Sequence, residues 1–332
     1  MNRAIALCLL IGILWTGAAA EPGVPPSNYG STSAPPQALT VPVIVFTSVA
    51  KTKPMPNRVR PPGAGQGVGA VQTVVSTSPE REPHTFNSYV LRAIEAVPSG
   101  GGYAVTKTAM ANLCQSMRIE DNESLVLTPA MARPSFCSSA TYLIFLHAIE
   151  EMETEGHLKL SAVTKRRLLV DNQRDGVGVW GRWNANGPGT ARLFYELKLG
   201  RNFTELSEAQ PGDFVKVWWT DAIGAKEKGH SVIFLGTSRD EQGALSIIYW
   251  SSNIPMGFGE KTAPISKIKH MVFSRFEHPE RLNDVGQAPA KDAYLASMLT
   301  ANESFTNLLA KVGVLSPASR AELVPEEAGA RR

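Results

Sequence analysis

The sequence contains few cysteines, no excess of charge of either sign and no long hydrophobic run. Its longest apolar stretch, residues 4–15, is too short to span a bilayer, which takes about 20 residues, and no later stretch approaches that length. The 33 basic and 30 acidic residues nearly balance, so no nucleic-acid partner is expected. No group of histidine, cysteine and carboxylate residues has the spacing of metal ligands, and we expect neither a metal nor another cofactor.

The N-terminal 20 residues have the three parts of a secretory signal peptide. Arg3 supplies a positive charge, residues 4–15 are apolar, and Ala18 and Ala20 are the small residues that a signal peptidase requires before a cut at Glu21. Cys8 lies inside the apolar stretch rather than at the cleavage point, so it is not a lipoprotein anchor. These features predict a secreted or periplasmic protein with no membrane anchor after cleavage of residues 1–20.

The rest of the chain divides by composition. Residues 21–84 are dense in proline, glycine, serine and threonine and lack periodicity, which predicts a disordered linker. Residues 85–282 carry the hydrophobic patterns of helices and strands and form the expected folded domain. Residues 283–332 are expected to add one amphipathic helix, ending near Gly313, and a polar tail.

Helical patterns precede strand patterns in residues 85–282. Helices are expected near residues 86–97, 106–117 and 137–149, and the last is apolar all round, which predicts burial. The glycine- and tryptophan-containing stretch 176–189 is expected to be a long loop. Runs of β-branched and aromatic residues predict strands at residues 213–219, 230–235, 245–250 and 269–276. This order predicts an α+β fold in which the buried helix packs on an antiparallel sheet.

Cys137 is the best candidate for a nucleophile. It lies where a loop enters the buried helix, so its sulfur faces the positive end of the helix dipole and several backbone N–H groups that have no partner within the helix. Such a position lowers the pKa of a thiol and favours the thiolate. Cys114, in contrast, falls inside a helix among apolar residues, where burial keeps a thiol unreactive. The backbone N–H of Cys137 is the natural oxyanion donor, and a second donor is open, with Tyr103 and Gln115 upstream.

A thiolate nucleophile needs a base, and His230 is the best placed of the six histidines because it begins a strand. If the following hairpin turns about Asp240, Ser251 lies opposite His230, and alternation puts Ser251 and Asn253 on the same face of the sheet. Either side chain suits the task of accepting the imidazole Nδ1–H and fixing its tautomer. Asn253 is preferred for its amide oxygen, and Ser251 is kept as the alternative.

Two other interpretations of the sequence remain open. Cysteine pairs in exported proteins commonly form structural disulfides, and a Cys114–Cys137 bond would indicate a non-catalytic binding or scaffold protein. A transglutaminase-like acyl transferase shares the order of cysteine helix and histidine strand, but it needs an acidic residue on the next strand, which here offers Tyr249, Ser251 and Asn253.

Three segments, in chain order, resemble the signatures of the NlpC/P60 cysteine peptidases: residues 135–139 (Ser-Phe-Cys-Ser-Ser), 210–215 (Gln-Pro-Gly-Asp-Phe-Val) and 230–236 (His-Ser-Val-Ile-Phe-Leu-Gly). The resemblance implies a papain-like fold, Cys137 as nucleophile, His230 as base, and hydrolysis of amide bonds in peptides, typically those of bacterial peptidoglycan.

The chain also departs from that family pattern. Phe136 stands where the family usually has aspartate, and Ser139 where it usually has glycine. The distance from Cys137 to His230 implies an insertion within residues 158–202, and residues 249–253 contain no histidine, the residue the family often uses third. The substrate bond and the third catalytic residue are therefore left open.

Overall fold

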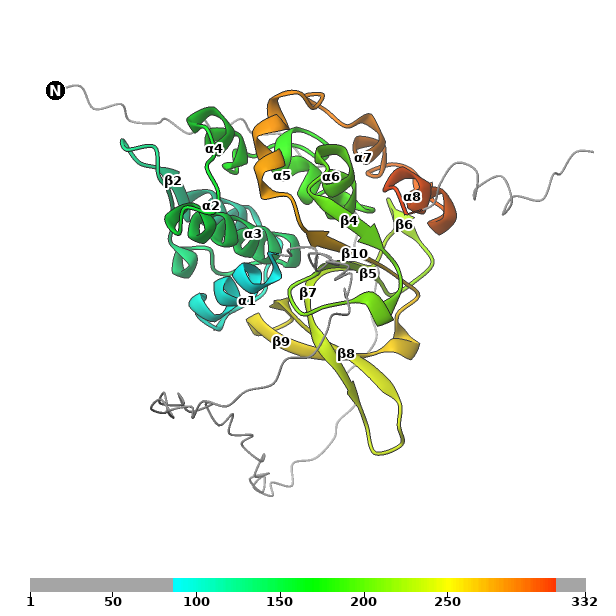
Figure 1. The fold of residues 1–332 in the computed structure, drawn as a ribbon. Coiled ribbons are helices and arrows are strands. Elements are labelled where there is room, and N and C mark those ends of the chain that lie inside the picture. Colours follow the sequence, from blue (N-terminus) through cyan, green and yellow to red (C-terminus); the bar gives the residue numbers. More distant parts are fainter. Residues whose placement is uncertain (1–85, 315–332) are drawn as a thin grey trace, which may run out of the picture. The chain divides into compact units, whose positions relative to one another are not determined.

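A computed structural model describes residues 86–314 of the chain (Figure 1). The predicted signal peptide, the predicted linker and the tail beyond residue 314 lie outside the described residues. Within residues 86–314, none of the helices has both the length and the apolar character needed to cross a membrane.

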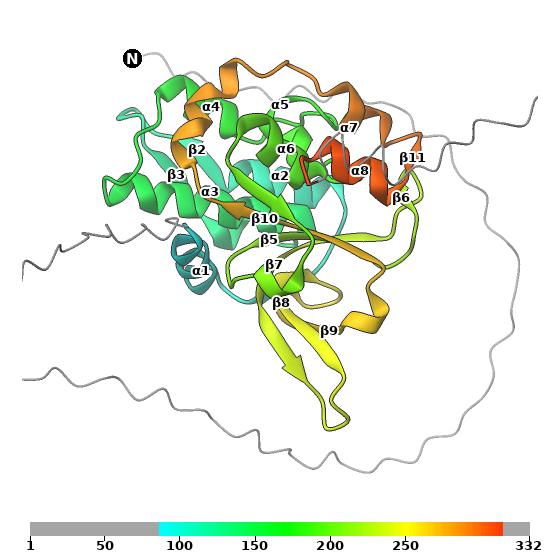
Figure 2. The ribbon, with the colours of Figure 1, turned by 45° about the vertical axis from the view of Figure 1, so that its right-hand side comes forward.

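The central element is a seven-stranded antiparallel sheet in the order β1-β9-β8-β7-β5-β10-β4. Its strands are β1 (Gly100–Gly101), β4 (Gly200–Phe203), β5 (Phe214–Trp218), β7 (Gly229–Arg239), β8 (Leu245–Asn253), β9 (Gly257–Pro264) and β10 (His270–Phe276). The turn between β7 and β8, residues 240–244, projects beyond the rest of the sheet (Figure 2). The four strands of this sheet expected from the sequence are present as β5, β7, β8 and β10, and β1, β4 and β9 are additional.

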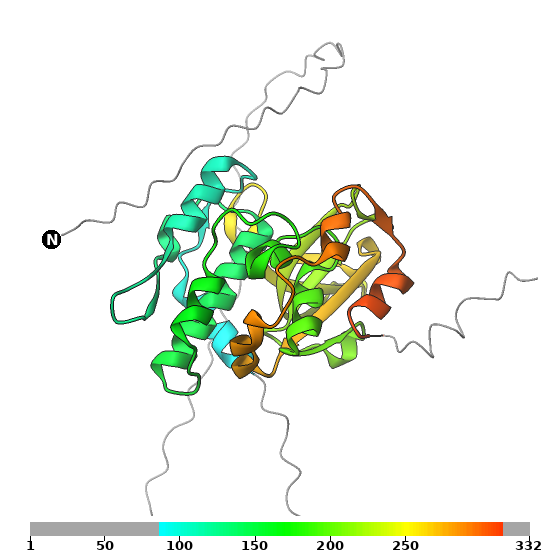
Figure 3. The ribbon, with the colours of Figure 1, turned by 90° about the horizontal axis from the view of Figure 1, so that it is seen from above.

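The helices in the first half of the described chain are α1 (Asn87–Ala96), α2 (Lys107–Gln115), α3 (Cys137–Thr154) and α4 (Ala162–Leu168). The strand pair β2 (Met117–Ile119) and β3 (Leu125–Leu127) connects α2 to α3. Helix α3 contacts α1 on one side and strands β7 and β8 on the other, and Figure 3 shows this group of helices beside the sheet. The structure is therefore α+β, with the cysteine helix packed against an antiparallel sheet.

Helix α3 is buried because it is apolar around most of its circumference. Residues from Tyr142 to Leu146 and Ala148, Ile149 and Met152 are fully buried, and they belong to the largest hydrophobic cluster of the described residues. The burial expected from the sequence is confirmed. Burial of this kind, at about 25 cal/mol per Å² of apolar surface, fixes the helix and with it the position of Cys137.

The sheet is apolar on its second face as well. Val215, Val232, Phe234, Tyr249 and Phe273 form a separate cluster there, closed by residues of short 3-10 segments. The paired strands β5, β7 and β8 are therefore held between two apolar layers, which give His230 of β7 and Asn253 of β8 a rigid support.

Residues 210–213, the Gln-Pro-Gly-Asp segment, stabilise the fold. The Asp213 carboxylate is fully buried and accepts two hydrogen bonds from Arg275 of β10, at 2.8 and 2.7 Å. It also accepts from Asn87 Nδ2 at 2.9 Å, which ties α1 to the sheet. Gly212 has a φ of +96°, and a Cβ there would collide with the backbone of Asn87. Glycine is thus required by close approach and by conformation.

The expectation of a long loop at residues 176–189 is wrong. This stretch forms α5 (Gly178–Trp183) and leads into α6 (Gly189–Leu197). Trp180 and Trp183 are fully buried, and their rings lie 5.1 and 5.3 Å from that of Tyr142 in α3. The glycines mislead a pattern-based prediction because they serve close packing: a Cβ on Gly181 or Gly189 would collide with neighbouring carbonyl oxygens.

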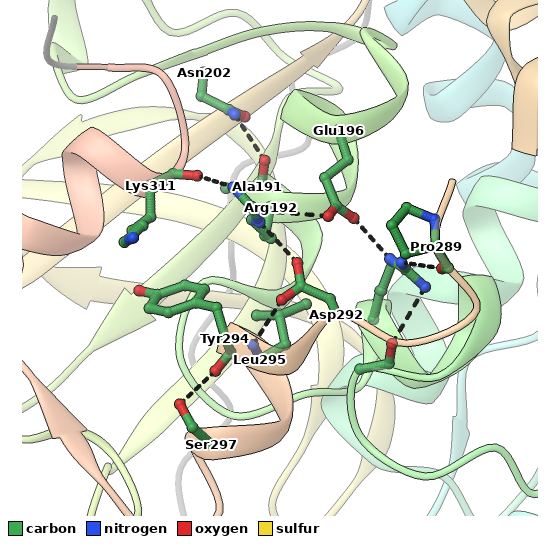
Figure 4. Close-up of polar contacts among 12 residues, drawn as sticks. Ala191, Arg192, Glu196, Asn202, Pro289, Asp292, Tyr294, Leu295, Ser297 and Lys311 are labelled. Carbon is green, nitrogen blue, oxygen red and sulfur yellow. Dashed lines mark hydrogen bonds and ion pairs between the residues drawn. The ribbon is translucent and has the colours of Figure 1, made fainter. Parts of the chain in front are cut away.

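The expectation of a single helix after residue 283 is also wrong. The segment forms the 3-10 helix η4 (Pro279–Gly286), then α7 (Ala293–Ser297), strand β11 (Asn302–Glu303), which pairs with β6 (Ile223–Gly224), and α8 (Phe305–Lys311). Arg192 of α6 holds it by donating to the Asp292 carboxylate at 2.8 Å and to the Lys311 carbonyl at 2.6 Å (Figure 4). Gly313, at φ +74°, follows α8 as expected for a helix end.

Candidate active site

Cys137 occupies the first turn of α3 and is partly exposed. The helix begins here because Ser139 bonds back to the preceding residue: its hydroxyl accepts from the Phe136 N–H at 2.9 Å and donates to the Phe136 carbonyl at 2.7 Å. Ser139 is therefore a buried capping residue. This position, where the NlpC/P60 pattern usually has glycine, stabilises the start of the helix.

His230 and Asn253 contact each other. The Nε2 atom of His230 lies 3.2 Å from Oδ1 of Asn253. The Asn253 amide group donates both of its hydrogens elsewhere, to the Ser251 carbonyl at 3.2 Å and the Gly259 carbonyl at 2.8 Å. Because both N–H donors are occupied, the oxygen faces His230 and accepts from Nε2–H. Nδ1 is then the nitrogen available to Cys137, the reverse of the assignment expected from the sequence.

The difference between Asn253 and Ser251 comes from strand register. Ile233 pairs with Trp250, and Phe234 with Tyr249. Each partner on β8 therefore lies two positions later in the sequence than the turn about Asp240 predicts. Continued to the start of β7, this register brings Asn253 rather than Ser251 beside His230. The ring of Tyr249 also lies against the imidazole, with centroids 5.8 Å apart.

Ser251 has a supporting position. Its side chain is fully buried, and its hydroxyl donates to the Ser231 carbonyl at 2.7 Å. The N–H of the same Ser231 donates to the sulfur of Cys137. Ser251 thus holds the strand segment that touches Cys137, and no hydrogen bond joins its side chain to His230.

The thiol of Cys137 is acidified by its neighbours. Burial by itself raises the pKa, but the hydrogen bond and charge of His230, the N–H of Ser231 and the charge of Lys216 together bring the pKa of Cys137 down from 9.0 to about 7. The contacts that favour the anion outweigh desolvation. A substantial fraction of the sulfur is therefore thiolate at neutral pH.

A pocket of about 520 Å³ lies next to Cys137. One wall comes from the segment before and within α2, including Tyr103 and Met110, and the other includes Asp175, Asn184, Lys216 and Glu227. Such a volume suits a peptide-sized group. Ser138 contacts Asn184 at 2.5 Å between hydroxyl and amide oxygen, so the segment that follows α5 forms part of the pocket.

The sequence pattern does not indicate Lys216 or Glu227 as residues of the site. Lys216 Nζ lies 2.7 Å from Glu227 Oε1, while Glu227 Oε2 accepts from the N–H groups of Gly187 and Gly224 and from Trp218 Nε1. The sequence does offer one signal for Lys216, because it is a charged residue within the apolar strand pattern 214–218. Glu227, 11 residues later in a loop, has no such signal.

Two serines connect the loop before Cys137 to the strand that carries Asn253. Ser135 donates to Ser252 between hydroxyls at 2.8 Å, and the Ser252 hydroxyl donates to the Ser135 carbonyl at 3.0 Å. Both side chains are buried. This contact fixes the spacing between the segment before Cys137 and the end of β8.

Of the two upstream candidates for a second oxyanion donor, only Tyr103 lines the pocket, whereas Gln115 lies exposed at the end of α2. Burial, with a smaller contribution from the charge of Cys137, raises the pKa of Tyr103 to about 12. The Tyr103 phenol is therefore protonated at neutral pH, as a hydrogen-bond donor must be.

The alternative disulfide is not formed in the structure, where both Cys114 and Cys137 carry thiols. Cys114 belongs to α2 and packs on the main hydrophobic cluster, whereas Cys137 is turned toward His230 and Ser231. Within residues 86–314 no group of three or more histidine, cysteine, aspartate or glutamate side chains is arranged to hold a metal ion.

The chain matches no protein-family model, no curated protein and no solved structure. Assignment of a function therefore depends on the chemistry of the site.

Proposed function

We propose that this protein is a cysteine hydrolase that cleaves amide bonds, with Cys137 as nucleophile, His230 as general base and acid, and Asn253 as the residue that orients the imidazole. The observation that carries the proposal is the chain of contacts from an acidified thiol at a helix start, through His230, to an amide oxygen 3.2 Å from its second nitrogen. Nucleophile, base and orienting group in this order are the general requirement for covalent acyl transfer.

The reaction follows from these positions. The thiol proton of Cys137 passes to Nδ1 of His230, and the thiolate adds to a substrate carbonyl carbon. The C–N bond breaks as His230 gives that proton to the leaving amine, which leaves a thioester on Cys137. Neutral His230 then takes a proton from water on Nδ1 while the water oxygen adds to the thioester carbon. The C–S bond breaks, which releases the carboxylic acid and restores the Cys137 thiolate beside protonated His230. The Cys137 backbone N–H, in the first turn of α3, stabilises the oxyanion in both steps. Tyr103 is the second donor that fits the pocket.

The substrate class rests on the resemblance to the NlpC/P60 peptidases and their papain-like fold, and it implies bacterial cell-wall peptides outside the cytoplasm. The pocket supports a polar peptide substrate, since Asp175, Asn184 and Lys216 offer charges and amides beside the nucleophile. Export, proposed from residues 1–20, brings the enzyme to that substrate.

The test is mass spectrometry of muropeptides and of unrelated peptides after incubation with the purified mature protein. New fragments that each gain one water at a single amide bond are expected, and Cys137→Ala must abolish them. Cys114→Ala, which removes the other thiol of the described residues and leaves the pocket lining unchanged, is the matched control. If muropeptides stay intact but unrelated peptides are cut, the enzyme class holds and the substrate class is wrong. If neither is cut, the chain is better described as a binding protein.

A further inference from the structure

A second pocket, of about 600 Å³, shares no lining residue with the one beside Cys137. It lies among α4, α5, α6 and η4. Its apolar wall includes Val179, Leu193 and Leu197, all buried, and the half-buried Val285 and Ala288. The volume is that of a small-molecule site, which typically combines an apolar wall with a few polar groups.

The polar groups of this pocket are mainly guanidinium groups. Arg166 and Arg167, in the last turn of α4, are exposed at the pocket and make no side-chain hydrogen bond or ion pair with any residue of the described range 86–314. The adjacent Lys165, in contrast, is paired with Glu153 at 3.0 Å. Asp171 is the only carboxylate among the lining residues.

The third guanidinium is part of the wall. Arg182 is buried, and it donates to Glu196 at 2.7 Å and to the Pro289 carbonyl at 2.6 Å. Because protein oxygens already accept from the N–H groups of Arg182, the guanidinium groups left to bind a ligand are those of Arg166 and Arg167. The guanidinium of Arg167 rests against Gly286, where a Cβ would collide with its Nη1 atom. Gly286 thus leaves the space in which Arg167 reaches the pocket.

We propose that this pocket binds a carboxylate carried on an apolar chain, with the carboxylate held by Arg166 and Arg167 and the chain against Val179, Leu193 and Leu197. Guanidinium groups pair with carboxylates in a planar, two-bond geometry. An uncharged ligand would leave both arginines without a partner, and a short carboxylate would leave the apolar wall in water. The site is independent of the hydrolase chemistry.

The test is isothermal titration calorimetry of the Cys137→Ala protein, which cannot turn a ligand over, with sodium octanoate as probe. Saturable binding at one site is expected. Octanol has the same chain and no charge, and butyrate has the charge and a short chain; the affinity of each should be lower than that of octanoate by a factor of about ten or more. The affinity of octanoate for the Arg166→Gln/Arg167→Gln protein should fall by the same factor. Arg174→Gln, an exposed arginine outside the pocket, is the matched control and should bind as the parent does.

Two further variants separate loss of the site from loss of the fold. Gly286→Val displaces the Arg167 guanidinium, and Ala288→Leu fills the pocket while both arginines stay. Each should weaken octanoate binding with an unchanged circular dichroism spectrum. The proposal is overturned if octanoate does not bind saturably, if octanol binds equally well, or if the double arginine variant keeps the parent affinity, because binding would then be absent or merely hydrophobic adsorption.

Discussion

Asn253 presents its amide oxygen to Nε2 of His230 at 3.2 Å while both of its N–H bonds are taken by carbonyl groups of Ser251 and Gly259. The amide therefore has one orientation, and it sets the tautomer of the imidazole. A neutral His230 carries its proton on Nε2, which leaves the Nδ1 lone pair for the thiol of Cys137. This relationship distinguishes the roles of Asn253 and Ser251.

Replacing Asn253 by Ala should lower kcat by about 100-fold, because the imidazole loses the partner that selects its tautomer and orientation, a loss in the usual range for general acid–base catalysis. Ser251→Ala should cost about 1 kcal/mol of stability, the worth of one hydrogen bond, and leave most of the activity. Steady-state kinetics on muropeptide fragments and thermal melts measure both. The reverse order, with Ser251→Ala the more damaging to kcat, would show that Ser251 orients the histidine.

The thiol of Cys137 should react with iodoacetamide along a curve whose midpoint is near pH 7, because its pKa is lowered to about 7 and only the thiolate is nucleophilic. The lowering of the pKa favours the anion, so reactivity rises as the pH passes through 7 and is lost below it. Peptide mass mapping at each pH separates Cys137 from Cys114.

His230→Ala removes the strongest contact that favours the thiolate and should move the midpoint for Cys137 toward that of an ordinary thiol, near 8.5. A different result would show a disulfide in solution and overturn the catalytic proposal: neither cysteine reacts until a reductant is added, and Cys114→Ala and Cys137→Ala each lose roughly 2–5 kcal/mol of stability.

The serine pair between the nucleophile loop and β8 should be energetically coupled. Ser252→Ala leaves the buried Ser135 hydroxyl without an acceptor, at a cost of about 1–3 kcal/mol. In Ser135→Ala the Ser252 hydroxyl keeps the Ser135 carbonyl as its acceptor, so the loss should be about 1 kcal/mol. Because the two residues share the same contact, the double variant should lose about 0.5–3 kcal/mol less than the sum of the singles. Urea unfolding of the four proteins gives the coupling energy. Strict additivity would mean that the two segments are positioned by other contacts.

Arg275→Met should destabilise the fold by about 3–5 kcal/mol, because it leaves the fully buried Asp213 carboxylate without its cationic partner. The double variant with Asp213→Asn should recover part of that loss, since no charge is then buried. Denaturant unfolding measures both. A loss of activity in folded Arg275→Met protein without loss of stability would instead assign the Gln-Pro-Gly-Asp segment a role in the reaction.

The sequence pattern predicted the structure correctly where the signal was local. The apolar run after Cys137 predicted a buried helix, and β-branched runs predicted β5, β7, β8 and β10, because periodicity of side chains along the chain reports which face is buried. The pattern failed at residues 176–189, where glycines needed for close packing of α5 and α6 resembled loop residues. It failed again after residue 283, where separated apolar residues were assigned to one helix.

The sequence by itself determined that a cysteine begins a buried helix and that a histidine begins a strand, since both follow from local patterns of apolar and polar residues. Only the tertiary structure decided that Asn253 rather than Ser251 meets the imidazole, that Nε2 is the nitrogen it meets, and that Lys216 and Glu227 line the same pocket as Cys137. A shift of two residues in strand register keeps every side chain on its face while changing its neighbour. Side-chain periodicity therefore could not choose the partner, and pairing across β7 and β8 did.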